Sequence, residues 1–359
     1  MKGLVVTSTD IESLVARLPK VELHAHLEGS VRAETAIELA DKNGVKLHSD
    51  DPAHFYSGRY EQEDFFKQFF GVCNALATQE DCGRAIYEVL CDQAAAGNVR
   101  YTELFCQPTM HPTLTYPEML EGLLDGMKRA EADAGIVCRL LPAINREQSP
   151  EVALQLVRDI IDNPRDRVLG IGLDGNPYIP ASDFAAAFGL ARESGLHRTA
   201  HAGVPVYDTR EVLDVLGCER VDHGYYVVED AELLDRVVRD RIHFTACWTL
   251  AGEYFDTDRA SSPVQAMVDA GMSVSINTDD PRIFHTDIGK EYLLTTRHLG
   301  WDLQTAWDRV LDAAASVWLP EDEKQQLHAR LKDEADALGL GLTSDRLSGE
   351  QPVRRSEKS

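Results

Sequence analysis

The stretch VELHAHLEGS, residues 21–30, determines how the rest of the chain is interpreted. Its first part, 21–26, is a short run that predicts a β-strand, and this strand ends in His24-Ala25-His26. Residues two apart on a strand point to the same side. Both imidazoles therefore project from one face of the predicted strand.

Seven more runs of this kind follow, with amphipathic helical patterns between most of them. The further expected strands are 99–107, 137–144, 168–173, 197–201, 220–223, 242–247 and 273–278. The clearest helical patterns cover 118–134, 151–162, 182–194, 208–216, 230–240 and 263–270. Such alternation indicates parallel βαβ units, and eight of them favour a closed (β/α)8 TIM-type barrel of the α/β class over an open sheet.

The longest interruption, 33–98, lies between the first two expected strands, and further helical patterns follow the last strand. Several helical stretches within 33–98 carry a dense set of aromatic residues: Phe55, Tyr56, Phe65, Phe66, Phe69 and Phe70. These helices either add to the core or form a hydrophobic lid over the barrel mouth that suits a flat aromatic ligand. We expect one barrel domain over 1–338, with 33–98 as its helical lid insertion, and a flexible tail over 339–359.

The charge balance excludes several classes of partner. The 359 residues include 36 Lys and Arg against 60 Asp and Glu, a formal net charge of −24. Nucleic acids and anionic membrane surfaces both require clustered cations, so we expect neither as a partner. Seven cysteines without a Cys-x-x-Cys pair and the lack of a signal-like apolar run favour a cytoplasmic protein with reduced thiols. The expected partner is a small-molecule substrate, and the sequence does not indicate an oligomeric state.

Metal-ligand side chains recur at the expected carboxyl ends of strands, where barrels of this type place their chemistry. These residues are His24 and His26 on the first strand, His201 on the fifth, His223 on the sixth, and Asp279 and Asp280 after the eighth. A lone His-x-His or Asp-Asp-Pro arises by chance or marks a turn. Three histidines and a carboxylate from separate strands together predict a site that suits zinc and leaves room for a water, although iron and manganese accept similar ligands.

With these residues in place, the chain resembles the adenosine and adenine deaminase family of the amidohydrolase superfamily over residues 19–332. The matching stretches are VELHAHLEGS (21–30), VRYTEL (99–104), TAHAG (199–203), RVDHG (220–224) and SINTDDP (275–281). The resemblance implies a TIM-type barrel that binds one zinc ion per chain. It also implies hydrolytic removal of an amino group from a purine-like ring.

The resemblance further implies roles for individual residues. The zinc ligands it implies are His24, His26, His201 and Asp279, with Asp279 and His223 as the catalytic pair. His223 would take a proton from the water on the zinc and steady the resulting hydroxide. Substrate contacts are implied for four residues: Asp280 and the backbone of Gly175 at ring nitrogens, and Glu28 and Gly29 beside the first two ligands.

One position departs from the family in a way that concerns the reaction. Where the family reads His-Ala-Gly-Glu, this chain ends the motif in Val204. In the family that glutamate protonates the ring nitrogen next to the carbon under attack, and valine has no proton to give. Loss of a positioned proton donor commonly costs ~10²–10⁴-fold in rate. The segments 175–177 and 247–251 also depart from the family, which favours a pocket rebuilt for another substrate.

Three functions are compatible with this pattern. The first is a zinc-dependent deaminase of an adenosine- or adenine-related or other heteroaromatic amine, with altered substrate preference. The second is a zinc enzyme of another reaction type, such as a ring-opening hydrolase or a lyase in secondary metabolism, and the third is a non-catalytic purine-binding homologue. The nearby carboxylates that could replace the lost acid are Asp174, Asp208, Asp222 and Glu253.

Overall fold

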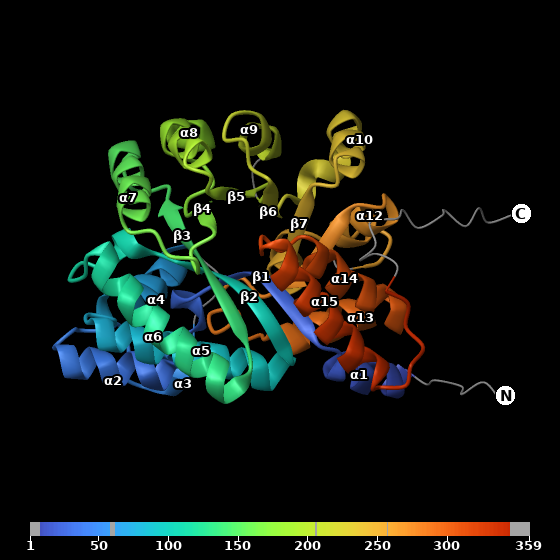
Figure 1. The fold of residues 1–359 in the computed structure, drawn as a ribbon, viewed down its shortest axis with the longest axis horizontal. Coiled ribbons are helices and arrows are strands. Elements are labelled where there is room, and N and C mark those ends of the chain that lie inside the picture. Colours follow the sequence, from blue (N-terminus) through green and yellow to red (C-terminus); the bar gives the residue numbers. More distant parts are fainter. Residues whose placement is uncertain (1–7, 58–61, 205–206, 257, 345–359) are drawn as a thin grey trace, which may run out of the picture.

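The computed structural model describes residues 8–57, 62–204, 207–256 and 258–344. Its eight strands pair in chain order, every neighbouring pair is parallel, and a bridge between Ala25 and Asp279 brings the first and last edges together (Figure 1). The strands are β1 (Lys20–His26), β2 (Val99–Cys106), β3 (Val137–Asn145), β4 (Gly170–Asp174), β5 (His197–Ala202), β6 (Arg220–His223), β7 (His243–Cys247) and β8 (Ser273–Asn277). The predicted (β/α)8 TIM-type barrel is confirmed.

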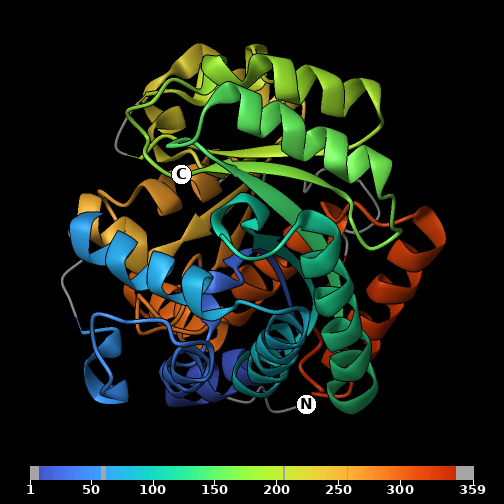
Figure 2. The ribbon, with the colours of Figure 1, turned by 90° about the vertical axis from the view of Figure 1, so that its left-hand side faces the viewer.

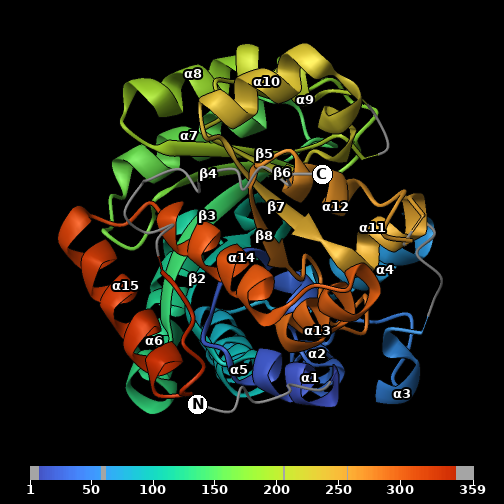
Figure 3. The ribbon, with the colours of Figure 1, turned by 90° about the vertical axis from the view of Figure 1, so that its right-hand side faces the viewer.

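Helices surround this barrel in the order that a βα repeat requires. Those that follow β2 to β7 are α6 (Tyr116–Ala134), α7 (Pro150–Asp162), α8 (Ala185–Glu193), α9 (Thr209–Asp214), α10 (Ala231–Arg239), α11 (Trp248–Tyr254) and α12 (Pro263–Asp269). Four more lie at the chain ends: α1 (Ser8–Arg17), α13 (Ile288–Leu299), α14 (Leu303–Ala315) and α15 (Glu321–Asp336). Figure 3 shows α13, α14 and α15 together on the side of the barrel where α1 also lies. Among the described residues, none of the helices is long and apolar enough to cross a membrane.

The insertion between β1 and β2 contains α2 (Ala33–Asn43), α3 (Pro52–Phe55), α4 (Gln62–Ala75) and α5 (Gln79–Gly97). The long helix α5 packs closely on α6, where a side chain on Gly122 would place its Cβ 2.1 Å from the carbonyl oxygen of Gln79. Figure 2 shows α4 beside the carboxyl ends of the strands. Helix α4 therefore contributes to the wall of the barrel mouth.

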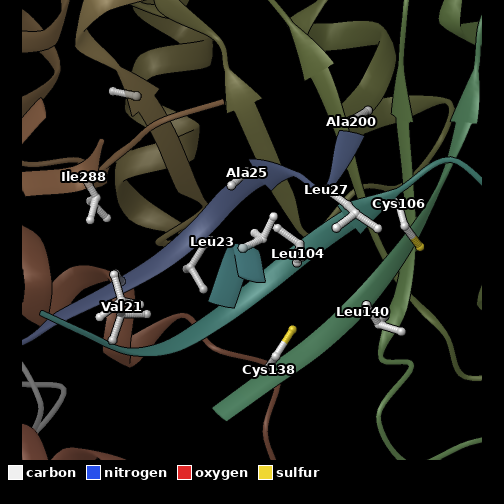
Figure 4. Packing of buried hydrophobic residues seen from close by; sticks show 14 of the residues in the cluster. Val21, Leu23, Ala25, Leu27, Leu104, Cys106, Cys138, Leu140, Ala200 and Ile288 are labelled. Carbon is white, nitrogen blue, oxygen red and sulfur yellow. The ribbon is translucent and has the colours of Figure 1, made fainter. Parts of the chain in front are cut away.

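Strand β1 is buried on both faces, and this burial explains how it positions its histidines. Val21, Leu23 and Ala25 are fully buried and join the apolar layer shared with β2 and β3 (Figure 4). The alternate residues, among them His24 and His26, point the other way, into the barrel. The alternation thus directs both imidazoles toward the interior.

The predicted strand bounds differ from the observed ones by at most two residues. The largest difference is at β4, where Val168 makes only an isolated bridge to Leu140 before the regular strand begins. Helix α1 was not among the predicted elements, although Ile11, Leu14 and Val15 have the i, i+3, i+4 spacing of an amphipathic helix. Residues 345–359 of the predicted tail lie outside the described part of the chain.

Candidate metal and substrate site

Three histidines and an aspartate meet at the carboxyl end of the barrel. Nε2 of His201 lies 3.0 Å from Nε2 of His24 and 3.1 Å from Nε2 of His26. Nε2 of His24 and Nε2 of His26 each lie 3.2 Å from Oδ1 of Asp279. A zinc ion with bonds of about 2.0–2.1 Å separates its tetrahedral ligand atoms by roughly 3.3 Å. The donor set and its spacing therefore fit zinc.

His223 faces the same centre from the end of β6. Its Nε2 lies 3.6 Å from Oδ2 of Asp279, and its side chain is 5 % exposed. Burial, with the neighbouring imidazole of His24, lowers the pKa of His223 well below its ordinary value. The neutral ring can accept a proton from a group held beside the metal ligands.

The backbone is strained at both of these catalytic candidates. His223 has φ 65° and Asp279 has φ 63°, in the left-handed region that residues other than glycine rarely adopt. Each such residue costs on the order of 1–3 kcal/mol and persists only where the surrounding structure enforces it. This backbone conformation directs both side chains toward the cluster of candidate ligands at the barrel mouth.

A buried hydrogen-bonded chain behind the ligands orients His24. Oγ1 of Thr245 donates to Oδ1 of Asp222 over 2.9 Å, and Thr199 donates to Oδ2 of Asp222 over 2.8 Å. Because the hydroxyl proton of Thr245 is used in this way, its oxygen accepts from Nδ1 of His24, 2.9 Å away. The proton of His24 is thereby held on Nδ1, and the lone pair of Nε2 faces the metal position.

A cavity of about 340 Å³ opens from the metal ligands toward the surface. Its lining includes the carboxylates of Asp174 and Asp280, the amide of Gln107, and the apolar side chains of Val204, Leu250 and Pro177. Aromatic rings complete the lining, namely Phe65, Phe66 and Phe69 of α4, Phe284, and Tyr178 and Tyr254. The chain therefore encloses a site large enough for a heteroaromatic ring.

The four predicted substrate contacts occupy different positions. Gly175 and Asp280 line the cavity. Glu28 lies outside the lining, where its Oε1 accepts hydrogen bonds from the backbone of Gln107 (2.9 Å) and from His111 (3.0 Å). Gly29 makes room for Asp280, since a Cβ on it would lie 1.8 Å from Oδ1 of that carboxylate. Two of the four thus reach the cavity, and two support it from behind.

The structure separates the four carboxylates considered as replacements for the missing acid. Asp222 is bonded to threonines behind the ligands, and Glu253 is exposed on α11 outside the described lining. Asp208 is bonded to the backbone N–H of Gly203 (2.7 Å) and to Arg146 (3.2 Å). Asp174 alone among the four lines the cavity.

Asp174 lies against the metal ligands. Its Oδ2 is 3.4 Å from Nδ1 of His26, and it also accepts a hydrogen bond from Gln107. Burial raises the pKa of Asp174 to about 6, although the charges of His26 and His201 oppose this.

Several site residues escaped the sequence analysis. Thr245 carried no signal because it lies within a strand, and Arg146 and Phe284 lie in segments without a motif. Their place in the site depends on contacts that the chain makes across the barrel mouth, so no local pattern could have identified them.

Comparison with known proteins gives a consistent result. The profile of the family described as "Adenosine deaminase" matches residues 19–334. An adenine deaminase of Streptomyces coelicolor is 33% identical over 336 residues, which cover 89% of this chain and 95% of that protein. The solved structure of an amidohydrolase from Burkholderia ambifaria with bound zinc has a TM-score of 0.85 and 31% identity, covering 97% of each chain. The adenine deaminase of Arthrobacter aurescens has a TM-score of 0.80 and 27% identity, covering 90% of this chain and 99% of that one.

Proposed function

Because the chain belongs to the adenosine deaminase family, a family of hydrolases that act on carbon–nitrogen bonds other than peptide bonds, we propose that it is a zinc-dependent hydrolytic deaminase of a purine-like or other heteroaromatic amine. The observation that carries this proposal is the meeting of His24, His26, His201 and Asp279 beside a cavity. The last three of them line that cavity together with His223. The chain keeps all four residues that the family resemblance assigns to metal binding, and it keeps His223 beside them.

The residues divide the work as follows. His24, His26, His201 and Asp279 hold one zinc ion per chain, which when bound makes hydroxide available near neutral pH. His223 accepts and returns the proton at its Nε2. Two polar contacts then orient the substrate: the carboxylate of Asp280 takes a ring N–H, and the backbone of Gly175 contacts another ring position.

The charge of the lining narrows the substrate class. Among the described lining residues Arg146 is the single lysine or arginine, and its guanidinium is bonded to the carbonyl oxygen of His201 (2.6 Å) and to Asp208. A phosphate group requires free cationic donors. We therefore favour an amine without a phosphate, either a free base or a nucleoside.

The apolar side chain of Val204 supports an altered substrate. Val204 lines the cavity three residues after the candidate ligand His201. Of the four considered carboxylates, Asp174 alone lines the cavity, and its Oδ2 lies 3.4 Å from Nδ1 of His26. A neutral ring needs a proton at the nitrogen next to the carbon under attack, and a positioned acid supplies ~10²–10⁴-fold of the rate. Adenosine should therefore be a poor substrate.

The test is ammonia release by the zinc-loaded protein from a panel of amines: adenine, adenosine, guanine, 2,6-diaminopurine and melamine. We expect zinc-dependent ammonia release from at least one of them, with adenosine at least ~10²-fold below the rate of an ordinary family member. His201→Ala provides the metal-deficient control.

Adenosine turnover of ~10 s⁻¹, an ordinary enzyme rate, would overturn the altered preference. Zinc-dependent consumption of a compound without ammonia would indicate a ring-opening or lyase reaction instead. Tight binding without turnover would indicate a non-catalytic homologue.

A further inference from the structure

Two aspartates that line the cavity, Asp174 and Asp280, each have a carboxylate oxygen without a hydrogen-bond partner among the described residues. Asp174 and Asp280 are 5 % and 4 % exposed, and Oδ1 of each has no hydrogen-bond partner among the described residues. A carboxylate can only accept hydrogen bonds, and a buried acceptor without a partner is rare in a folded protein. Both residues line the cavity, so their carboxylates favour a ligand with N–H donors or a positive charge.

The apolar part of the lining offers no proton. Val204, Leu250 and Pro177 have only hydrocarbon side chains, and each of them lines the cavity. The carboxylate nearest in sequence to Val204 is that of Asp208, which accepts hydrogen bonds from the backbone N–H of Gly203 and from the guanidinium of Arg146. A ring nitrogen placed against Val204 therefore contacts a hydrocarbon side chain in place of a carboxylic acid.

The aromatic residues of the lining also suit a cation. Phe65 of α4 stacks on Phe69 with a centroid distance of 5.7 Å and on Phe284 with a distance of 6.2 Å. A positively charged ring placed on the face of such an aromatic group is attracted by the negative face of the ring, and more strongly where water is excluded. The aromatic residues and the two carboxylates therefore favour the same charge.

The chemistry of deamination connects these observations. When hydroxide adds to the amino-bearing carbon, an electron pair moves onto the neighbouring ring nitrogen. A neutral ring must receive a proton there, whereas a ring nitrogen that already carries an alkyl group and a positive charge accepts the pair and becomes neutral. Loss of the amino group with one proton then gives the carbonyl product, so that the cation and one water yield a neutral lactam and one ammonium ion.

We propose that the preferred substrates are cationic aminoheterocycles that are alkylated at the ring nitrogen beside the amino-bearing carbon, such as N1-alkylated aminopurines. This inference rests on the proposed deaminase function and specifies its substrate class. The alkyl group lies against Val204, and the positive ring faces Asp174 and Asp280. The chain thereby dispenses with a proton donor at that nitrogen.

The experiment uses the full-length, zinc-loaded protein and two matched pairs of compounds, 1-methyladenine with adenine and 1-methyladenosine with adenosine. Ammonia release is measured alongside the expected lactam, 1-methylhypoxanthine or 1-methylinosine, by mass spectrometry. In at least one pair we expect kcat/KM to be ~10²-fold or more higher for the methylated compound, the factor that a positioned acid otherwise supplies. We also expect tighter equilibrium binding of that methylated compound by calorimetry.

Two variants locate the effect at Val204. Val204→Glu should reverse the preference, because the added carboxylic acid can protonate an unmethylated ring and occupies the space of the methyl group. Val152→Glu introduces the same side chain at a position on α7 that is 38 % exposed, and it should leave the preference unchanged.

The possible outcomes distinguish a failure of the proposed substrate preference from a failure of the proposed deaminase function. Faster deamination of the unmethylated compound in both pairs overturns the inference and leaves the deaminase function standing. Ammonia from guanine, 2,6-diaminopurine or melamine with none from the four adenine compounds has the same meaning. No ammonia from any compound overturns the proposed function itself. An unchanged preference in Val204→Glu overturns the role assigned to Val204.

Discussion

Removal of the Thr245 hydroxyl tests how the barrel prepares His24 for metal binding. Thr245 lies on β7 and is fully buried, and its hydroxyl links Asp222 to Nδ1 of His24 through two hydrogen bonds of 2.9 Å. Thr245→Val keeps the shape of the side chain and removes both bonds. The proton of His24 is then free to move to Nε2, where it blocks the lone pair that should face the zinc.

The contacts that remain set the size of the expected effect. Without the hydroxyl, Nδ1 of His24 keeps a weak hydrogen-bond contact with Sγ of Cys247 at 3.7 Å, whereas Oδ1 of Asp222 at 4.0 Å is beyond hydrogen-bond distance. Loss of such an orienting partner weakens metal binding by about 10–100-fold, equivalent to roughly 1.4–2.7 kcal/mol. Oδ1 of Asp222 also loses its donor, which lowers the free energy of unfolding by about 1–3 kcal/mol.

The assay is competition for zinc against a chromophoric chelator, with thermal unfolding followed in parallel. Thr295→Val is the matched control, since Thr295 is equally buried but its hydroxyl donates to the carbonyl oxygen of Glu291 within α13 (2.7 Å). We expect the control to lose some stability and no zinc affinity. A zinc affinity in Thr245→Val equal to that of the unmodified protein would refute the idea that this hydroxyl fixes the tautomer of His24.

Three further predictions follow from the same geometry. His201→Ala should reduce the zinc content from one per chain to a small fraction, measured by atomic absorption after dialysis, and retention of a full equivalent would contradict the ligand assignment. Gly29→Ala should raise KM more than it lowers kcat, because its Cβ displaces the Asp280 carboxylate; an unchanged KM would argue against substrate binding by Asp280. Burial raises the pKa of Glu291 to about 7 from the ordinary 4.5. Between these two pH values the folded state keeps a proton that the unfolded chain releases. The stability that protonated Glu291 contributes is therefore complete below pH 4.5 and is lost as the pH rises to about 7. The free energy of unfolding of the unmodified protein should therefore fall by about 2 kcal/mol relative to that of Glu291→Gln between pH 5 and 7. Thermal unfolding would show this as a relative fall in Tm, and parallel curves of Tm against pH would contradict it.

The barrel and the meeting of the candidate ligands at its mouth were predictable because both depend on local patterns. The run at β1 identifies a strand by itself, and a parallel barrel brings the carboxyl ends of its strands to one mouth. His24, His201 and Asp279 could therefore be placed together although they come from distant parts of the chain. No knowledge of side-chain packing was needed for that step.

The supporting residues could not be predicted, because their roles arise only from packing. Thr245 acts on His24 across 221 positions of the chain, and any threonine in a strand would look the same in sequence. Gly29 was expected to line the pocket, whereas the structure shows it giving space to the Asp280 side chain. Such roles depend on distances of an ångström between elements, which no residue pattern encodes.

The consequence of Val204 follows from the sequence and the structure together. The resemblance to a family identifies the position as a lost proton donor, but it leaves several carboxylates as possible replacements. The hydrogen bonds of Asp208 and Asp222 and the exposure of Glu253 remove three of them, and Asp174 lies against His26. A site with a full set of candidate zinc ligands and with Val204 at the position of the family's acid is better matched to a substrate that needs no proton there. The question of function thereby becomes a measurable preference between a methylated and an unmethylated ring.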